Sequence, residues 1–185
     1  MSSGLTSVKD TDLIILQNVT DDELEELCYS SRYFHQLCQN RILWHDRILK
    51  LYPNFPFNEK MELKKLYYKL KVGDWTAIAV WADYHDNVTI LKWMMMLKEY
   101  KMYLINNIKK YLNILSTVYN RKEKIKVLIQ MYNFIYNHRY AFTHYILGEN
   151  FTNTVKIKLD ELQQETPEPE LKDMFESYKQ SIFNL

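Results

Sequence analysis

Residues 11–52 constrain the fold of this chain most, because they hold short apolar segments separated by residues that start helices. Thr20 followed by Glu23 forms a capping-box pair, in which the hydroxyl serves one free backbone amide and the carboxylate serves another. The acidic residues that follow Thr20 suit the positive end of a helix dipole. The pattern predicts a helix from about Asp21, preceded by a helical turn or two that starts at Leu13.

Two further start signals follow in the same stretch. Ser30 or Ser31 is placed to cap a second helix, and Asn40 is placed to cap a third, which Pro53 must end. We therefore expect three helices of about ten residues, joined by short turns. Helices this short are not stable alone, so they must pack against each other or against a partner.

The composition favours helix over the whole chain. Only 3 glycines and 4 prolines occur in 185 residues, which weighs against turn-rich β folds, and the apolar content is ordinary for a globular protein. We predict an all-α fold, with room for one domain or for a small module attached to a larger one.

The rest of the chain continues this pattern. Asn58 is placed to cap a helix, and the stretch 89–119 is helical with a break near Glu99. A turn at Asn120 leads to another amphipathic helix, so the two helices are expected to form an antiparallel αα-hairpin within a helical bundle. A helix at 153–164, an acidic connector with prolines and a last helix complete the prediction.

Apolar residues stand at regular intervals around Leu24. After Leu24 they are Leu27, Phe34, Leu37, Leu43 and Trp44, at +3, +10, +13, +19 and +20, and before it Val19, Leu16, Ile15 and Leu13, at −5, −8, −9 and −11. This spacing resembles the F-box, a helical module that docks onto a Skp-type adaptor in cullin-based ubiquitin ligases. The resemblance implies that these ten residues form the adaptor-binding module. Short helices with such residues at helical spacing are also ordinary core of an all-α domain.

Two positions depart from the family pattern. The opening Leu-Pro pair, which contributes to adaptor binding in the family, falls on Ser7 and Val8, and the Val usual at +6 is Ser30. The expected organisation is a disordered N-terminus at 1–9, an F-box-like module at 10–53 and an α-helical domain at 58–185.

The resemblance implies a non-catalytic function. An F-box-like substrate adaptor would hold a client protein, through its C-terminal domain, near a ubiquitin-charged enzyme. Divergent N-terminal modules of this kind are familiar from large DNA viruses of amoebae, and the abundance of Tyr, Asn, Lys and Ile, which have AT-rich codons, agrees with such a source. The alternative is a viral structural or assembly protein whose pattern is only helical core. The sequence identifies neither the client nor the oligomeric state.

A third interpretation rests on the distribution of charge. Residues 98–126 carry a net charge of +6, whereas residues 1–30 carry −6 and residues 158–176 carry −5. Basic side chains interleaved with tyrosines suit contacts with nucleic acid through phosphates and stacking. The candidate contacts are Lys109, Lys110, Lys122 and Lys124. A solvated face of the αα-hairpin explains the same pattern.

We expect no catalytic, cofactor or metal site. The 3 glycines are too few for a phosphate loop, and the 5 histidines have no paired metal-ligand spacing. Cys28 and His35 have the residue types of a nucleophile and its base, but the apolar pattern already explains Cys28. Cys28 and Cys38 are expected as buried free thiols of a reducing compartment. Without a signal-peptide pattern or a membrane-spanning run, we expect a soluble protein of the cytoplasm or nucleus.

Overall fold

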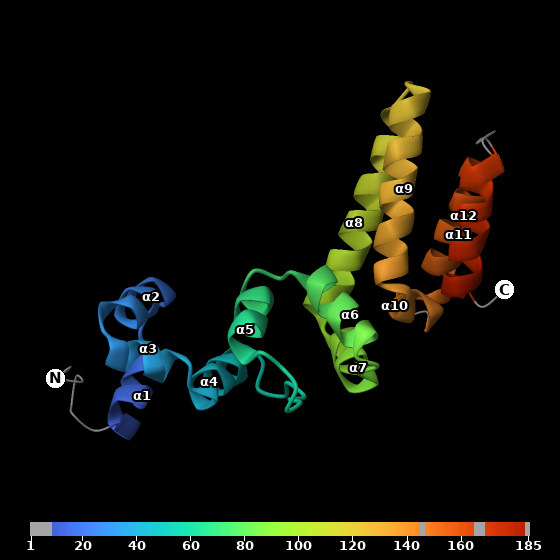
Figure 1. Cartoon of the computed structure of the whole chain (residues 1–185). Coiled ribbons are helices and arrows are strands. Elements are labelled where there is room, and N and C mark those ends of the chain that lie inside the picture. Colours follow the sequence, from blue (N-terminus) through green and yellow to red (C-terminus); the bar gives the residue numbers. More distant parts are fainter. Residues whose placement is uncertain (1–8, 145–146, 165–168, 184–185) are drawn as a thin grey trace. The chain divides into compact units, whose positions relative to one another are not determined.

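The computed structural model describes residues 9–144, 147–164 and 169–183 (Figure 1). Within these ranges every regular element is an α-helix, twelve in all, which confirms the predicted all-α class. The chain divides into two compact units, Met1–Asp74 and Trp75–Leu185. Of the N-terminus predicted to be disordered only Lys9 is described, and it begins a helix. Ser7, Val8 and the connector around Pro167 lie outside the described residues.

The first unit holds the stretch with the strongest start signals. Its helices are α1 (Lys9–Asn18), α2 (Asp21–Ser30), α3 (Arg32–Cys38), α4 (Arg41–Leu51) and α5 (Leu63–Lys71). Thr20 and Glu23 form both bonds of the capping box, and Ser31 and Asn40 accept backbone amides at the starts of α3 and α4. The helix caps predicted from the sequence at Thr20, Ser31 and Asn40 are therefore confirmed.

The prediction of three helices for 10–53 is wrong, because α1 is a complete helix of 10 residues. It packs against α4, and this contact buries Leu13 and Leu16. A helix of 10 residues is not stable alone, so tertiary packing completes it.

The expected boundary between 53 and 58 also differs from the structure, because α5 belongs to the first unit. The ring of Tyr67, on α5, lies 5.6 Å from that of Trp44, on α4. Asn58 does not cap this helix, since its side chain accepts from Lys60 N in a turn and the helix begins at Leu63. Gly73 follows the end of α5 with φ of 67°, a left-handed conformation that favours glycine.

The second unit is built around the predicted αα-hairpin. Its helices are α6 (Trp75–Tyr84), α7 (Val88–Met96), α8 (Lys98–Thr117), α9 (Arg121–Asn137), α10 (Arg139–Thr143), α11 (Glu149–Gln164) and α12 (Pro169–Phe183). α8 and α9 lie side by side, joined by a short turn that ends at the cap residue Asn120 (Figure 1). The break predicted near Glu99 occurs at Leu97, and α11 begins four residues earlier than expected.

The core of the second unit lies between the hairpin and its neighbours. Leu104 and Ile108 of α8 are fully buried, as are Met131 and Tyr132 of α9. The Tyr132 ring stacks on Phe175 of α12, with 4.3 Å between ring centroids. α6, α10 and α12 pack on α9, and α7 packs on α8, so the hairpin is the part of this unit on which these helices pack.

Candidate functional site: a docking surface on the N-terminal helices

Most of the ten residues that carry the F-box resemblance have side chains buried in the core of the first unit. Seven are buried: Leu13, Leu16, Leu24, Phe34, Leu37, Leu43 and Trp44. Three are half-buried: Ile15, Val19 and Leu27. The shared spacing therefore describes the core of the unit, and few of these side chains reach its surface. Only the half-buried residues can contact a partner without unfolding the helices.

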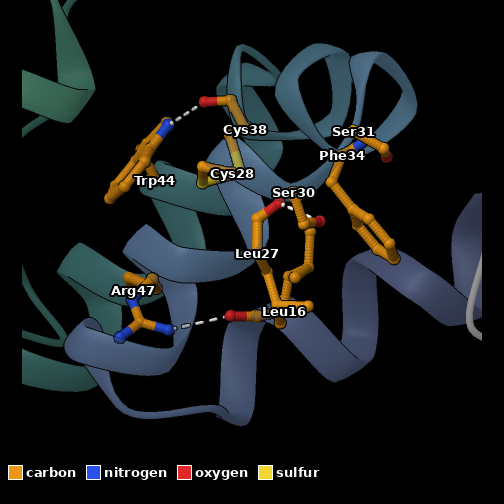
Figure 2. Close-up of a disulfide and its surroundings, with 9 residues drawn as sticks. All are labelled: Leu16, Leu27, Cys28, Ser30, Ser31, Phe34, Cys38, Trp44 and Arg47. Atoms are coloured by element: carbon orange, nitrogen blue, oxygen red, sulfur yellow. Dashed lines mark hydrogen bonds between the residues drawn. A yellow bond between two sulfur atoms is a disulfide. The ribbon is translucent and has the colours of Figure 1, made fainter.

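Trp44, which matches the last position of the resemblance, is covered by the chain itself. Its indole Nε1 donates to the backbone oxygen of Cys38 at 2.7 Å (Figure 2). Its ring lies 5.6 Å from Tyr67 and 5.8 Å from Tyr68, and the ammonium of Lys64 stands over it. Because α5 supplies these contacts, this face of α4 is closed to a partner.

Cys28 and Cys38 form a disulfide, so the expectation of free thiols is wrong (Figure 2). Each sits at an inward position, one on α2 and the other on α3, and their Cα atoms are 5.8 Å apart. This separation is common for bonded cysteines, and the short turn between the helices produces it. The bond crosslinks α2 to α3, and Cys28 has no thiol with which His35 could form a catalytic pair.

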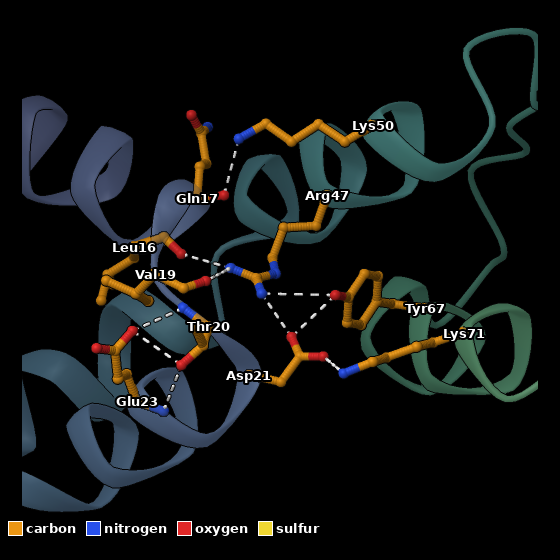
Figure 3. A network of polar contacts seen from close by, with 10 residues as sticks. All are labelled: Leu16, Gln17, Val19, Thr20, Asp21, Glu23, Arg47, Lys50, Tyr67 and Lys71. Carbon is orange, nitrogen blue, oxygen red and sulfur yellow. Dashed lines mark hydrogen bonds and ion pairs between the residues drawn. The ribbon is translucent and has the colours of Figure 1, made fainter.

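Arg47 was not singled out from the sequence, yet it connects the ends of two other helices (Figure 3). Its Nη1 donates to the backbone oxygens of Leu16 at 2.8 Å and Val19 at 3.0 Å, where α1 ends. Its Nη2 donates to the carboxylate of Asp21, where α2 begins. A cation here satisfies carbonyl groups that the end of a helix leaves unpaired.

The Asp21 carboxylate is the second centre of this network. It accepts from Tyr67 Oη at 2.9 Å and pairs with the Lys71 ammonium, both on α5 (Figure 3). The network therefore ties α1, α2, α4 and α5 together around one buried guanidinium. The inward position of Arg47, between Trp44 and Ile48 on the apolar stripe of α4, is the sequence signal that could have identified it.

A shallow groove lies beside this network, on the exposed side of α2. It is lined by Val19, Glu23, Glu26, Leu27 and Ser30 and has a volume of about 380 Å³. We call it the docking groove. Its apolar residues are Val19 and Leu27, and its other residues are exposed and polar. Two of the three half-buried residues of the F-box resemblance therefore line it.

The capping box holds one wall of the docking groove in place. The Glu23 carboxylate accepts from the backbone amide and the hydroxyl of Thr20, both at 2.8 Å, and Glu23 N donates back to Thr20 Oγ1 (Figure 3). The backbone hydrogen bond is the main cause that lowers the pKa of Glu23 below its ordinary value. The groove therefore keeps an ionised carboxylate at neutral pH.

The lysines considered for nucleic acid lie on the hairpin of the second unit. Lys109, Lys110 and Lys122 are exposed, and Lys124 is half-buried. The structure places Lys109 and Lys110 on α8 and the other two on the first turn of α9. The docking groove belongs to the first unit.

The absence of a metal site concerns the residues that the structure describes. No group of three or more His, Cys, Asp or Glu side chains there could hold a metal ion. None of the described helices has the length and apolarity that crossing a bilayer requires.

Comparison with known proteins yields no match for this chain, whether against family models, curated proteins or solved structures.

Proposed function

We propose that this chain is an F-box-like substrate adaptor whose first unit docks onto a Skp-type adaptor protein. Its second unit would then hold a client protein near a ubiquitin-charged enzyme, so that the chain acts by proximity and orientation. Support comes from the spacing of the ten positions of the resemblance, which α1, α2, α3 and α4 and the turn at Val19 carry.

The docking groove is the observation that carries this proposal. Val19 and Leu27, two of the ten positions of the resemblance, lie in it with partly exposed apolar side chains. The acidic Glu23 and Glu26 flank them, which suits a partner surface that is apolar at its centre and basic at its rim.

The burial of the other positions of the resemblance restricts the surface of the first unit that an adaptor can contact. Leu43 and Trp44 are covered within the unit, so an adaptor would contact the side of α2 that carries Glu26 and Leu27. Substitutions of Leu16 or Leu24 cannot test binding, because both side chains are fully buried and a charge there would unfold the unit.

The test measures binding of the purified chain to a purified Skp-type adaptor. The variants Glu26→Arg and Leu27→Arg alter the docking groove, and Glu25→Arg is the matched control. Glu25 is also an exposed acid of α2, but it lies near Tyr68 of α5 and does not line the groove. Circular dichroism of each variant verifies that the helices remain folded.

We expect the wild type to bind, the two groove variants to lose at least about tenfold in affinity, and Glu25→Arg to stay within about twofold. Absence of micromolar binding by folded wild type would overturn the proposal and favour the assembly interpretation. Equal binding by the wild type and both groove variants would show that the adaptor docks elsewhere.

A further inference from the structure

A pocket of about 530 Å³ lies along one face of the α8–α9 hairpin, in the second unit. We call it the hairpin pocket. Its α8 residues begin at Tyr103 and include Asn107, Lys110 and Tyr111, and these recur at helical spacing on one side of the helix. α9 supplies the facing wall, and Thr76 of α6 closes one end. Its volume falls within the range typical of small-molecule sites.

Three aromatic rings line this pocket, and we call them the aromatic cluster. Phe134, which is only 7% exposed, lies 5.8 Å from the ring of Tyr103 and 5.9 Å from that of Tyr111, and its plane is tilted by 50° and 53° to theirs. Both tyrosines are half-buried, and burial raises the pKa of Tyr111 above its ordinary value. Because the rings are tilted, the aromatic cluster offers a planar ligand the face or the edge of one tyrosine ring.

A buried histidine anchors the closed end of the pocket. His138, 1% exposed, has Nε2 2.9 Å from Thr76 Oγ1 and Nδ1 3.0 Å from Tyr100 Oη. Thr76 Oγ1 in turn lies 2.8 Å from Tyr103 Oη. Burial lowers the pKa of His138 to about 3, so the ring is neutral and has one donor and one acceptor nitrogen.

The direction of the two His138 hydrogen bonds follows from Tyr100. Tyr100 is 2% exposed, and His138 is the hydrogen-bond partner of its hydroxyl among the described residues, so Tyr100 donates to Nδ1. Nε2 then carries the proton of the neutral ring and donates to Thr76, whose Oγ1 forms a further hydrogen bond with Tyr103 Oη in which either hydroxyl is a possible donor. These bonds hold the Tyr103 hydroxyl in place from behind, where it lines the pocket.

Carboxamide side chains line the open part of the pocket. Asn107 Nδ2 donates to the backbone oxygen of Tyr103 at 2.9 Å, which leaves the side-chain carbonyl oxygen as an acceptor. Gln130 and Asn137 face it from α9. A carboxamide has a donor and an acceptor side by side, which matches the N6 and N7 edge of adenine.

Lys110 adds the one positive charge among the residues that line this pocket. Its side chain is exposed on α8, within the segment 98–126 that carries a net charge of +6. An ammonium group at the rim of an otherwise neutral pocket suits a phosphate or another small anion.

We propose that the hairpin pocket binds an adenine nucleotide, with its base against one tyrosine ring of the aromatic cluster and its phosphate at Lys110. The carboxamides form hydrogen bonds with the N6 and N7 edge of the base, and the Tyr103 hydroxyl forms a hydrogen bond with the ligand. The site lies in the second unit and does not depend on adaptor docking by the first. The nucleotide is either free or part of a single strand, since both present the same base and phosphate.

The test titrates the full chain with AMP and with adenosine by isothermal calorimetry. Lys110→Gln removes the cation of the pocket, and Lys109→Gln removes its exposed neighbour on α8, which does not line the pocket. We expect Lys110→Gln to weaken AMP binding about tenfold, and Lys109→Gln to leave it within about twofold. Adenosine, which has no phosphate, should bind the wild type and Lys110→Gln equally.

A second variant tests the hydrogen-bonded end of the pocket. Tyr103→Phe keeps the ring of the aromatic cluster and removes the hydroxyl, which also bonds to Thr76 Oγ1, so we expect AMP and adenosine to lose affinity alike, by about threefold to tenfold. Circular dichroism verifies that the helices remain intact. Equal loss of AMP affinity in Lys109→Gln and Lys110→Gln would overturn the proposal, because a diffuse basic surface explains that result.

A hexa-adenylate oligonucleotide distinguishes the two sources of ligand. If the natural ligand is a free nucleotide, the oligonucleotide binds no more tightly than AMP. If it is a single strand, the oligonucleotide binds more tightly, and Lys109→Gln weakens it without affecting AMP. Both results support the proposal, because in each case the ligand binds in the hairpin pocket. Failure of the folded wild type to bind AMP and hexa-adenylate saturably at millimolar concentrations would overturn the proposal.

Discussion

The guanidinium of Arg47 donates to the backbone oxygen of Leu16, 31 positions earlier in the chain, at 2.8 Å. This bond ends α1, and the ion pair of the same side chain with Asp21 holds the start of α2. One buried side chain thus contacts both the end of α1 and the start of α2, beside the docking groove.

Arg47→Met should lower the free energy of unfolding of the first unit by about 3 kcal/mol. The new side chain keeps the apolar stem, but it leaves the carbonyls of Leu16 and Val19 without their donor. It also removes the guanidinium that pairs with the Asp21 carboxylate. Urea denaturation measures the loss, and hydrogen exchange of α1 and α2 assigns it to this unit.

Lys50→Met is the matched control on α4. Lys50 also donates to a carbonyl of α1, that of Gln17 at 2.9 Å, but its side chain is exposed. This variant should lose less than about 1 kcal/mol. If Arg47→Met and Lys50→Met lower the free energy of unfolding by the same amount, the burial of Arg47 does not explain its contribution to stability.

Removal of the disulfide should destabilise the first unit without abolishing its helices. The bond closes a loop with a sequence separation of 10, for which chain entropy gives about 2 to 3 kcal/mol. Cys28→Ser and addition of a reductant to the wild type should lower the urea midpoint equally, and Cys28→Ser should not respond to the reductant. Alkylation of both cysteines in the unreduced native protein would contradict the bond.

Thr20→Ala should cost about 1 kcal/mol, because it removes the acceptor for the Glu23 amide at the start of α2. Thr20→Ser keeps a hydroxyl and should stay within a few tenths of a kcal/mol. Thermal unfolding followed by circular dichroism compares the two variants. The capping box would have no energetic role if Thr20→Ala behaved like Thr20→Ser.

The second unit should lose stability in mild acid because of His138. Its folded pKa of about 3 lies below the unfolded value of 6.5, so only the unfolded chain binds this proton between these values. The contribution of the buried neutral His138 to the free energy of unfolding is fully present above pH 6.5. It falls by about 1.4 kcal/mol per pH unit as the pH drops toward 3.

His138→Gln should flatten this dependence between pH 6.5 and 5, as measured by urea denaturation at a series of pH values. His144→Gln is the control, because His144 is exposed at the end of α10 and its loss should leave the slope unchanged. Parallel curves for the wild type and His138→Gln would exclude the buried imidazole as the cause.

Several elements were predictable because their signals are local. The capping box at Thr20, the caps at Ser31 and Asn40 and the hairpin turn at Asn120 each act over three or four residues. Where the local signal was weak, as in α1 and at Asn58, the prediction was wrong.

The candidate site was only partly predictable. Val19 and Leu27 belong to the set proposed from the sequence, but their accessibility depends on which other members of that set the fold buries. Nothing in the spacing around Trp44 indicates that α5 covers it, since Tyr67 and Tyr68 come more than 20 residues later.

By itself, the sequence determined the all-α class and the starts of most helices, because caps and periodicity depend on neighbours within one or two turns. Only the tertiary structure decided that Arg47 ends α1, that Cys28 meets Cys38 and that His138 supports Thr76, 62 positions away. Each of these contacts arises when helices pack together, and the positions of the partners along the chain do not encode it. The docking groove and the hairpin pocket are products of that packing.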